Sequence, residues 1–203
     1  MNTAEVEPSS VDGDPSTLST SAVHATNPAL YGRLGFDTIK DFTHITLLTS
    51  APNMLVVNPK IPARNITELI AYAKSNPGKL TFGSGGNGTT LHFSTASFLN
   101  ALGLNVLHVP YKSSGPALMG VLSGEVNMLM PDVGDVLNHI NNGALIALGI
   151  TGAVRNEKLP NLPTMKESGV AELKNWTYSS WIGFVAAEGI PTEANLRLQN
   201  ALQ

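Results

Sequence analysis

Cysteine is absent from the 203-residue chain, which excludes disulfides, thiolate metal sites and a cysteine nucleophile. Charged residues make up only 13% of the chain, and the basic ones form no stripe with interleaved aromatic residues, so nucleic acid is a poor candidate partner. No apolar run approaches the roughly 18 residues of a membrane-spanning helix. With 42% hydrophobic residues, the sequence predicts a soluble globular protein that buries one large core or two small ones.

Two further absences concern location and charge. The first twenty residues do not contain a basic region followed by an apolar region, so the sequence as given predicts no signal peptide. No Asp or Glu lies between Glu68 and Glu125, whereas Lys74, Lys79 and Lys112 fall inside this interval. A segment without carboxylates costs little to bring near a negative ligand, although chance alone is an alternative in a chain with so few charges.

Residues 79–100, KLTFGSGGNGTTLHFSTASFLN, are the stretch around which the chain is organised. They predict a short strand, a turn with four glycines in six residues, and a helix that opens at Thr89 or Thr90. Glycines at a strand-to-helix turn let a ligand approach bare backbone N–H groups, and the helix adds its own free donors and its positive dipole end. The pattern therefore predicts an anion-binding loop.

The surrounding sequence alternates between strands and helices. The predicted elements are strand 79–83, helix 89–102, strand 106–109, helix 116–122, strand 126–130, helix 135–141 and strand 145–151. Strands separated by helices of about ten residues indicate βαβ units and a parallel sheet. Ligands of such sheets bind at the carboxyl ends of the strands, where segments 83–90, 111–115 and 131–134 are predicted to lie.

The outer parts of the chain show weaker patterns. Residues 1–26 are polar and predict a loose arm. Residues 27–37 predict a helix with Asn27 as its cap, and the two apolar runs at 45–48 and 54–58 predict a pair of strands. Asn65 and Glu68 predict the capped start of another helix. Near the C-terminus, WIGFVAA predicts a strand over 181–187, and a helix is expected from Thr192.

Several catalytic patterns can be weighed against the glycine loop. GSGGNG formally fits a dinucleotide fingerprint, but the next predicted strand lacks the acid that would bind ribose, and no Lys-Ser or Lys-Thr completes a P-loop. A Ser84, His92 and Asp132 triad can be assembled on paper, yet Gly-x-Ser-x-Gly does not occur. His92 could face the pocket or make a structural hydrogen bond, and His108 is expected in the core. Asp132 and Asp135 are expected to be helix caps, and no zinc-site spacing is present.

Four blocks of the chain resemble a known family. THITLLTSAPNMLVVNP, PGKLTFGSGGNGTTLHFS, VLHVPYKSSGPALMGVLSGEVNMLMPD and ALGITGAVRNEKLPNLPTMKESGV are similar to consecutive blocks of the tripartite tricarboxylate transporter substrate-binding receptors, also called the Bug family. The resemblance implies an α/β fold like that of type II periplasmic binding proteins, with two α/β domains joined by crossing strands. It also implies a periplasmic, monomeric receptor without cofactor or catalysis, which passes a small organic carboxylate to membrane transporter subunits.

The same resemblance implies a set of ligand-binding residues. In the second domain they are Ser84, Gly85, Asn87, Gly88, Thr89, Thr90 and His92 of the glycine loop, Tyr111, Lys112, Ser113, Ser114 and Gly115 of the next helix opening, and Asp132, which closes that side. In the first domain, the segment 21–25 resembles the family's Ser-x-x-His-Ala loop and implies Ser21 and His24 as ligand residues, with the end of the N-terminal arm ordered. Asp12 and Gly13 align with the family's Asp-Gly before the strand that leads into this loop.

The sequence also departs from the family. Members begin with a signal peptide and a Pro-Pro-Gly-Gly loop, and their last helix is followed by further residues, so this chain is expected to be truncated at both ends. The expected division is an intact second domain, residues 59–145, and an incomplete first domain, residues 1–58 and 146–203, that includes the hinge strands. The alternatives that stay open are an NAD(P)-dependent or other nucleotide-using enzyme and a non-functional fragment of the receptor.

Overall fold

The computed structural model describes residues 16–202. The chain divides into two compact units: unit 1 contains the residues up to Thr49 and from Trp181, and unit 2 contains Ser50–Ser180. Unit 2 is therefore larger than the expected span of 59–145. The difference arises because the residues after 145 pack within unit 2, where Met165 and Leu173 are fully buried in its core.

Unit 2 is built on a five-stranded mixed sheet. Its strand order is β5-β4-β6-β3-β7, with β3 at Met54–Val57, β4 at Thr81–Ser84, β5 at Leu107–Pro110, β6 at Met128–Leu129 and β7 at Ile146–Ile150. β4 runs parallel to β5 and β6, as the βαβ pattern predicts, but β3 is antiparallel to both β6 and β7. The four strands of the predicted βαβ series, β4, β5, β6 and β7, therefore run in one direction as expected, and β3, which enters directly from β2 and was not part of that series, is the antiparallel strand between β6 and β7.

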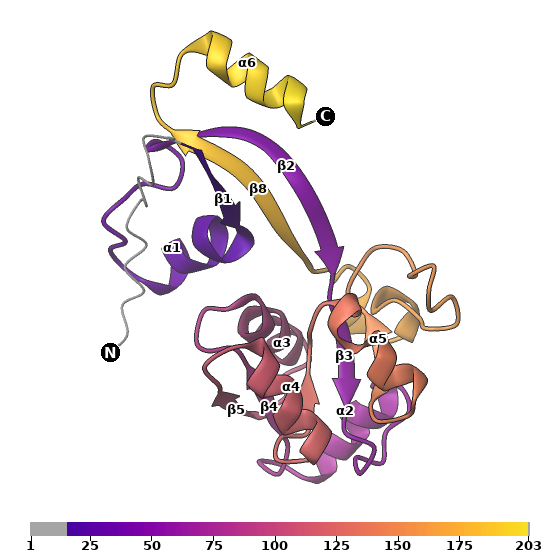
Figure 1. Cartoon of the computed structure of the whole chain (residues 1–203). Coiled ribbons are helices and arrows are strands. Elements are labelled where there is room, and N and C mark those ends of the chain that lie inside the picture. Colours follow the sequence, from indigo (N-terminus) through magenta and orange to yellow (C-terminus); the bar gives the residue numbers. More distant parts are fainter. Residues whose placement is uncertain (1–15, 203) are drawn as a thin grey trace. The chain divides into compact units, whose positions relative to one another are not determined.

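Two pairs of helices cover the two faces of this sheet. On one face, residues of α2 (Ile66–Ser75) and α3 (Thr90–Ala101) share a buried cluster with the sheet, and on the other face α4 (Ser114–Ser123) and α5 (Val133–Asn141) do so. Figure 1 shows α3 and α4 beside β4 and β5. This α/β/α layering places the starts of α3, α4 and α5 at the edge where β4, β5 and β6 end.

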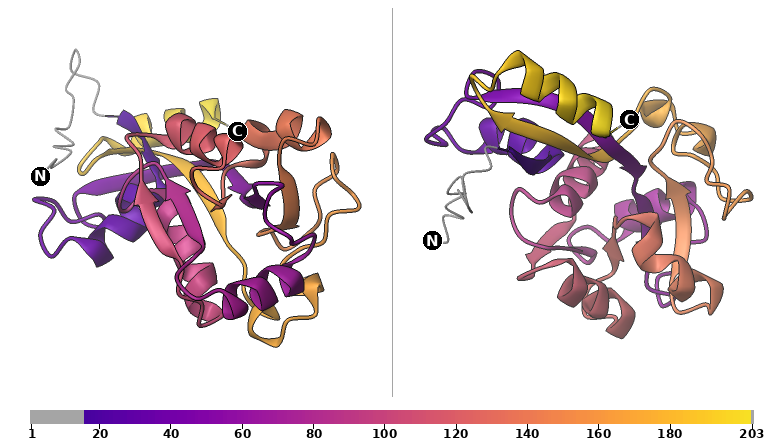
Figure 2. Two further views of the ribbon diagram at one scale, coloured as in Figure 1. Left: turned by 90° about the horizontal axis from the view of Figure 1, so that it is seen from below. Right: turned by 45° about the horizontal axis from the view of Figure 1, so that its top comes forward.

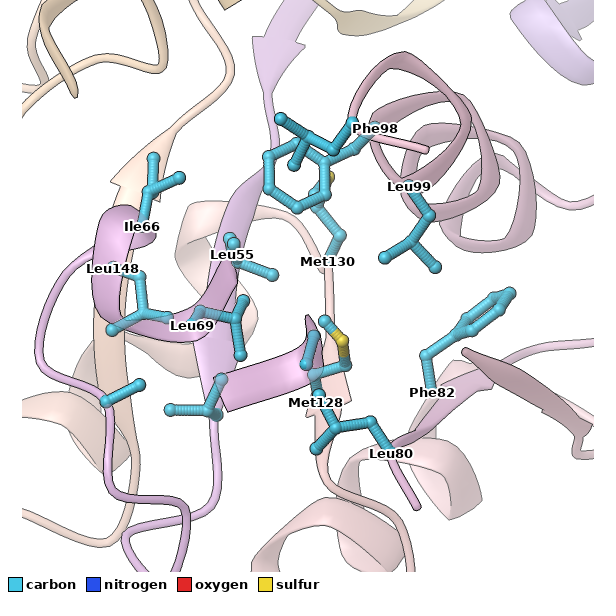
Figure 3. Packing of buried hydrophobic residues seen from close by; sticks show 14 of the residues in the cluster. Leu55, Ile66, Leu69, Leu80, Phe82, Phe98, Leu99, Met128, Met130 and Leu148 are labelled. Atoms are coloured by element: carbon cyan, nitrogen blue, oxygen red, sulfur yellow. The ribbon is translucent and has the colours of Figure 1, made fainter. Parts of the chain in front are cut away.

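The side chains of the core on the α2 and α3 face are buried, most of them almost completely. Phe98 and Leu99 of α3 approach the sheet beside Leu55 and Met130, and Leu69 of α2 packs nearby (Figure 3). Phe98 and Leu55 have no exposed surface, and burying one such side chain stabilises the fold by about 1.5–3 kcal/mol. This core holds α3, and with it the glycine loop, against β4.

The start of α2 confirms the predicted cap. The side-chain oxygen of Asn65 accepts from the Glu68 N–H at 2.9 Å, and the Glu68 carboxylate accepts from the Asn65 side chain at 2.7 Å and from the Arg64 N–H at 2.7 Å. Donors that the helix leaves free are thus satisfied by reciprocal side-chain bonds.

Unit 1 contains a three-stranded sheet in the order β1-β8-β2, in which β1 (Ser16–Thr20) and β8 (Ser179–Ala187) are antiparallel. The sheet also contains β2 (Phe42–Pro52), and the short π-helix η1 (Ala22–Thr26) leads into α1 (Asn27–Leu30). In Figure 2 the C-terminal helix α6 (Thr192–Ala201) lies along β2 and β8, and the Gln199 side chain donates to the Ile45 carbonyl at 3.4 Å. β2 and β8 are the two segments through which the chain passes between the units.

The end of the N-terminal arm is ordered, as the resemblance implies: its described part contains β1 and η1, while Asp12 and Gly13 lie outside the described residues. Two other predictions for unit 1 need correction. The helix expected over 27–37 ends at Leu30. β2 continues through the predicted break at 50–52, because the extended backbone before and at Pro52 is compatible with the strand.

The core of unit 1 is thin. Among its described residues only Ile45, Val185 and Ala186 are buried hydrophobic side chains, whereas Leu18 and Leu47 are each 61% exposed. No helix within residues 16–202 combines the length and apolar character that crossing a membrane requires. Most of the buried apolar surface of the described chain therefore belongs to unit 2.

Candidate functional site

The glycine loop follows β4 and takes a conformation that needs glycine. Gly86 and Gly88 have φ angles of +120° and +79°, a region that residues with a side chain rarely adopt. Gly85 is required for a different reason. A Cβ at this position would lie 3.1 Å from the Ser114 nitrogen and 3.2 Å from the Ser113 carbonyl carbon, so the loop packs directly on the backbone at the start of α4.

This contact brings two helix N-termini together. α3 begins immediately after the loop, with Thr89 as its N-cap, and α4 begins where Gly85 touches it, with Ser113 as its N-cap. Each N-terminus carries unsatisfied N–H groups and a partial positive charge of about half a unit, so the two fields add at the loop. The predicted meeting of segments 83–90 and 111–115 at one sheet edge is observed.

Some of the polar groups predicted for ligand binding are occupied within the loop. The Ser84 hydroxyl accepts from the Gly86 N–H at 3.1 Å, and the His92 Nδ1 accepts from the Gly88 N–H at 3.1 Å. The Thr89 hydroxyl donates to the Gly86 carbonyl at 2.8 Å and accepts from the His92 N–H at 3.4 Å. These groups hold the loop closed on itself, and their hydrogen bonds fix its shape.

Other donors are left for a ligand. Within residues 16–202, no acceptor is present for the backbone N–H groups of Thr90 and Leu91 at the start of α3 or of Ser114 and Gly115 at the start of α4. The Ser113 side chain makes no capping bond, and it is exposed together with Lys112, Ser114 and Gly115. Asn87, at the tip of the glycine loop, is exposed as well. A ligand at this surface would thus meet free backbone N–H donors beside the side chain of Lys112.

His92 and His108 form a stacked pair behind the loop. Their ring centroids are 4.2 Å apart, and the His108 ring also stacks on Phe82 at 4.7 Å. Burial lowers the pKa of both imidazoles, and the neighbouring His92 contributes further to a pKa of about 4 for His108. Both rings are therefore neutral at pH 7. Because the His92 Nδ1 accepts from Gly88, the proton of that ring lies on Nε2.

The structure pairs Ser84 with His108 rather than with His92. The Ser84 Oγ lies 2.6 Å from the His108 Nε2, so His108 is half-buried and hydrogen-bonded instead of being an inert core residue as expected. Ser84 has no exposed surface and its hydroxyl also contacts both polar groups of Gly86. This serine supports the loop and has no access to a substrate, unlike the nucleophile of a catalytic triad.

Tyr111 turns away from the loop opening. Its hydroxyl is buried against Gly120 of α4 and has no hydrogen-bond partner in the described part of the chain, while the ring also lies close to Gly83. The side chain of Tyr111 therefore packs between α4 and the sheet. A Cβ on Gly86 would lie 3.6 Å from the Tyr111 carbonyl oxygen, so the backbone of Tyr111 lies beside the loop.

Asp132 occupies the N-cap position of α5, but its carboxylate does not cap the helix. Its Oδ1 instead accepts from the Asn53 amide at 2.9 Å and from the Ser180 hydroxyl at 3.1 Å. The expectation of a capping aspartate was therefore wrong for Asp132. Burial raises the pKa of this carboxyl and Asp135 raises it further, while the two hydrogen bonds oppose the shift.

The residues around Asp132 were not found by sequence reasoning. Asn53 is fully buried, and its backbone pairs with that of Asp132 in an isolated bridge. Burial raises the pKa of the Tyr178 phenol, and the nearby Asp132 raises it further. The centroid of the Tyr178 ring is 6.1 Å from that of Phe93 on α3. These residues come from four separate segments, and none belongs to a motif that could have pointed to this site.

In unit 1, Ser21 and His24 lie at the start of η1. Ser21 is buried with 6% of its surface exposed. The His24 Nδ1 is 3.1 Å from the Thr38 carbonyl, and its ring packs against Phe42, His44 and Trp181. Burial is the main cause of a lowered pKa for His24, and its Nε2 is buried without a hydrogen-bond partner. No group of three or more possible metal ligands gathers within the described residues.

In this α/β unit, two helix N-termini converge on a glycine loop, an arrangement that is favourable for a negatively charged group. The chain belongs to the tripartite tricarboxylate transporter family receptors, whose family description matches it over residues 1–203. Among curated proteins it is 34% identical over 168 residues to a protein of the tcbD–tcbE intergenic region of a Pseudomonas species, covering 83% of this chain and 49% of that protein. It is 31% identical to BugT of Bordetella pertussis, covering 91% and 57%. The chain thus spans about half the length of these relatives.

Solved structures agree with the fold predicted from the resemblance. An R. palustris protein solved with adipate superposes with a TM-score of 0.82 at 32% identity, covering 91% of this chain and 61% of that one. MatC from Rhodopseudomonas palustris with bound malate gives a TM-score of 0.80 at 26% identity, covering 92% and 62%. The type II periplasmic-binding-protein fold is confirmed, and the chain covers about three fifths of these neighbours.

Proposed function

We propose that this chain is the ligand-capturing part of an extracytoplasmic receptor that delivers a small organic carboxylate to a tripartite transporter. The observation that carries the proposal is the convergence of the α3 and α4 N-termini at Gly85, with four backbone N–H groups left without acceptors. Each N–H donated to a carboxylate contributes about 1.5–3 kcal/mol, so a few of them suffice for micromolar affinity.

The relatives support the ligand class. The neighbours solved with adipate and with malate hold small carboxylates, and this chain shares their family and fold. For this chain we propose, in the same way, a periplasmic location, a monomeric state and membrane transporter subunits as partners. Ser84, Gly88, Thr89 and His92 are proposed to act by shaping the loop, and Ser21 and His24 by shaping the corresponding segment of unit 1.

The proposed activity is binding without turnover. Ser84 is buried, and the segment after β5 carries Tyr111 and Lys112 where a dinucleotide enzyme would place an acid for the ribose. A nucleotide-using enzyme is therefore the less favoured reading of the glycine loop.

Isothermal titration of the full chain at pH 7.5 with malate, succinate and adipate tests the proposal, with succinamide as a neutral control. At least one acid is expected to bind at micromolar concentration, succinamide is expected not to bind, and NMR of the recovered acid should show no conversion. NADH and NADPH serve as comparison ligands. Tight binding of a dinucleotide without binding of any acid would contradict the receptor function.

A further inference from the structure

The sequence contains two Asn-Gly pairs, Asn87-Gly88 in the glycine loop and Asn142-Gly143 at the end of α5. Both pairs lie in turns, both asparagines are exposed, and the two glycines have nearly equal φ angles of +79° and +76°. In such a pair the backbone nitrogen of the glycine can attack the side-chain amide of the asparagine, because no side chain on the glycine blocks the approach. The two pairs therefore offer a matched comparison of the same chemistry in different surroundings.

The first difference between the pairs is the group that accepts from the glycine N–H. The Gly88 N–H donates to the His92 Nδ1 at 3.1 Å, whereas the Gly143 N–H donates to the Ile140 carbonyl at 3.0 Å. The glycine nitrogen must lose its proton to attack, and a neutral imidazole within hydrogen-bond reach can take that proton, whereas a backbone carbonyl cannot. Gly88 is itself buried, so the imidazole rather than bulk water is the base at hand.

The second difference is the electric field at each asparagine. Asn87 lies three residues before Thr90, the first residue of α3, whereas Asn142 is the C-cap of α5. Attack on the side-chain amide puts negative charge on its oxygen, which the positive N-terminus of a helix stabilises and the negative C-terminus destabilises. The Asn142 side chain is also held in place, since its Oδ1 accepts from the Ala144 N–H at 3.0 Å. The Asn87 side chain has no hydrogen bond within residues 16–202 and can turn towards its neighbour.

We propose that Asn87 is a modification site at which the folded chain deamidates itself, with His92 as the base. The His92 Nδ1 takes the proton of Gly88 while the glycine nitrogen forms a bond to the Asn87 Cγ. The proton then passes to the side-chain nitrogen, the bond from this nitrogen to Cγ breaks, and ammonia leaves. Water opens the resulting five-membered imide at either carbonyl and gives aspartate or isoaspartate at position 87. The reaction exchanges an amide for a carboxylate, and water is its only co-reactant.

The product carries a fixed negative charge at the tip of the glycine loop. This carboxylate lies at the start of α3, where the N–H groups of Thr90 and Leu91 have no acceptor within the described residues. Resting on the proposed function, it competes with the carboxylate of a ligand for the same positive helix end and repels it. The modification therefore converts a loop that accepts an external anion into one that carries its own.

The test follows both pairs in the same molecule. The full chain is incubated at pH 7.5, folded or unfolded in urea, and peptide mapping by mass spectrometry gives the deamidation rate at each asparagine. In urea the two rates should be similar, because both pairs have lost their surroundings. In the folded chain Asn87 should react about tenfold or more faster than Asn142. His92→Gln keeps an acceptor for the Gly88 N–H but no base, so it should slow the reaction at Asn87 about tenfold and leave Asn142 unchanged.

The proposal is overturned if the ratio of the two rates is the same in the folded and the urea-unfolded chain, or if folded His92→Gln deamidates at Asn87 as fast as the native chain. Should His92→Gln fail to fold, the comparison of folded and unfolded native chain decides.

Isothermal titration with malate, succinate and adipate tests the consequence for binding. Asn87→Asp should bind the preferred acid about tenfold or more weakly than the native chain, whereas Asn142→Asp, which adds the same charge at the end of α5, should bind normally. Equal affinity of the two variants would overturn this consequence. Because the deamidation rates are measured by mass and without a ligand, failure of every acid to bind the native chain would refute the proposed function and not the modification.

Discussion

Two clusters of histidine and aromatic side chains, one in each unit, use similar residues in different ways. In unit 2, His92 and His108 stack on each other and on Phe82, and a nitrogen of each ring bonds to the glycine loop. In unit 1, His24 packs among aromatic rings but bonds only to the Thr38 carbonyl, and its other nitrogen has no partner. The first cluster organises a loop, whereas the second mainly fills space.

The difference follows from what surrounds each cluster. In unit 2, β4, β5 and α3 are held by a core with many fully buried side chains, so the imidazole nitrogens meet fixed loop atoms. In unit 1, a short π-helix leads into a four-residue helix and only three described hydrophobic residues are buried. Histidine becomes a positioning residue where rigid elements supply partners for its nitrogens.

The largest effect is expected from Gly85→Ala. The new Cβ would stand 3.1–3.2 Å from backbone atoms of Ser113 and Ser114, so the starts of α3 and α4 must move apart. Titration with the acid that binds the native chain should show a loss of affinity of about tenfold or more, equivalent to about 1.4 kcal/mol. Gly32→Ala in unit 1, where a Cβ meets nothing within 4 Å, is the control and should bind normally. Equal affinity of the two variants would remove the helix junction from the site.

The next effect concerns the stacked histidine pair of unit 2 and is measured by a pH titration. The unfolded chain protonates its histidines near the ordinary pKa of 6.5, whereas folded His108 does so near 4, so between these values the unfolded state holds more protons. The stability contributed by the neutral ring is complete above pH 6.5 and is lost as pH falls towards 4. Thermal melts should show a lower melting temperature across this range.

His108→Gln should make this dependence less steep, because its side chain can no longer titrate, while the lowered pKa values of His92 and His24 still contribute. If His108→Gln and the native chain lose stability in parallel from pH 6.5 to 4, groups other than the stacked pair govern the acid response.

The smallest effect is expected from His24→Phe in unit 1. The change removes one hydrogen bond, a loss of about 1 kcal/mol, but it also removes the unpartnered buried Nε2 and keeps an aromatic ring in the cluster. Urea unfolding should therefore show a net change below about 1 kcal/mol, and ligand affinity should stay within about twofold. His44→Phe, at its exposed neighbour, provides the comparison. A tenfold loss of affinity specific to His24→Phe would make this ring a ligand contact, as the family resemblance implies.

Sequence reasoning succeeded where local signals are strong. The glycine loop, the helices around it and the Asn65 cap were predicted within a few residues, because these features depend on backbone freedom, hydrophobic spacing and side chains that bond to nearby backbone atoms. It predicted β3 as a strand but not its antiparallel place between β6 and β7, which depends on how distant segments pair. It also failed for the cap expected of Asp132, because the competing donors come from residues 48 and 79 positions away.

The sequence by itself determined the family, the α/β character of unit 2 and the presence of a glycine loop between a strand and a helix, since each is encoded in short contiguous segments. Only the tertiary structure decided which donors of that loop are free and which are spent on Ser84, His92 and Thr89. It also decided that Asp132 faces Asn53 and Ser180. The physical reason is that a hydrogen-bonding group is available to a ligand only if no other part of the folded chain satisfies it first, and its competitors are brought together by folding.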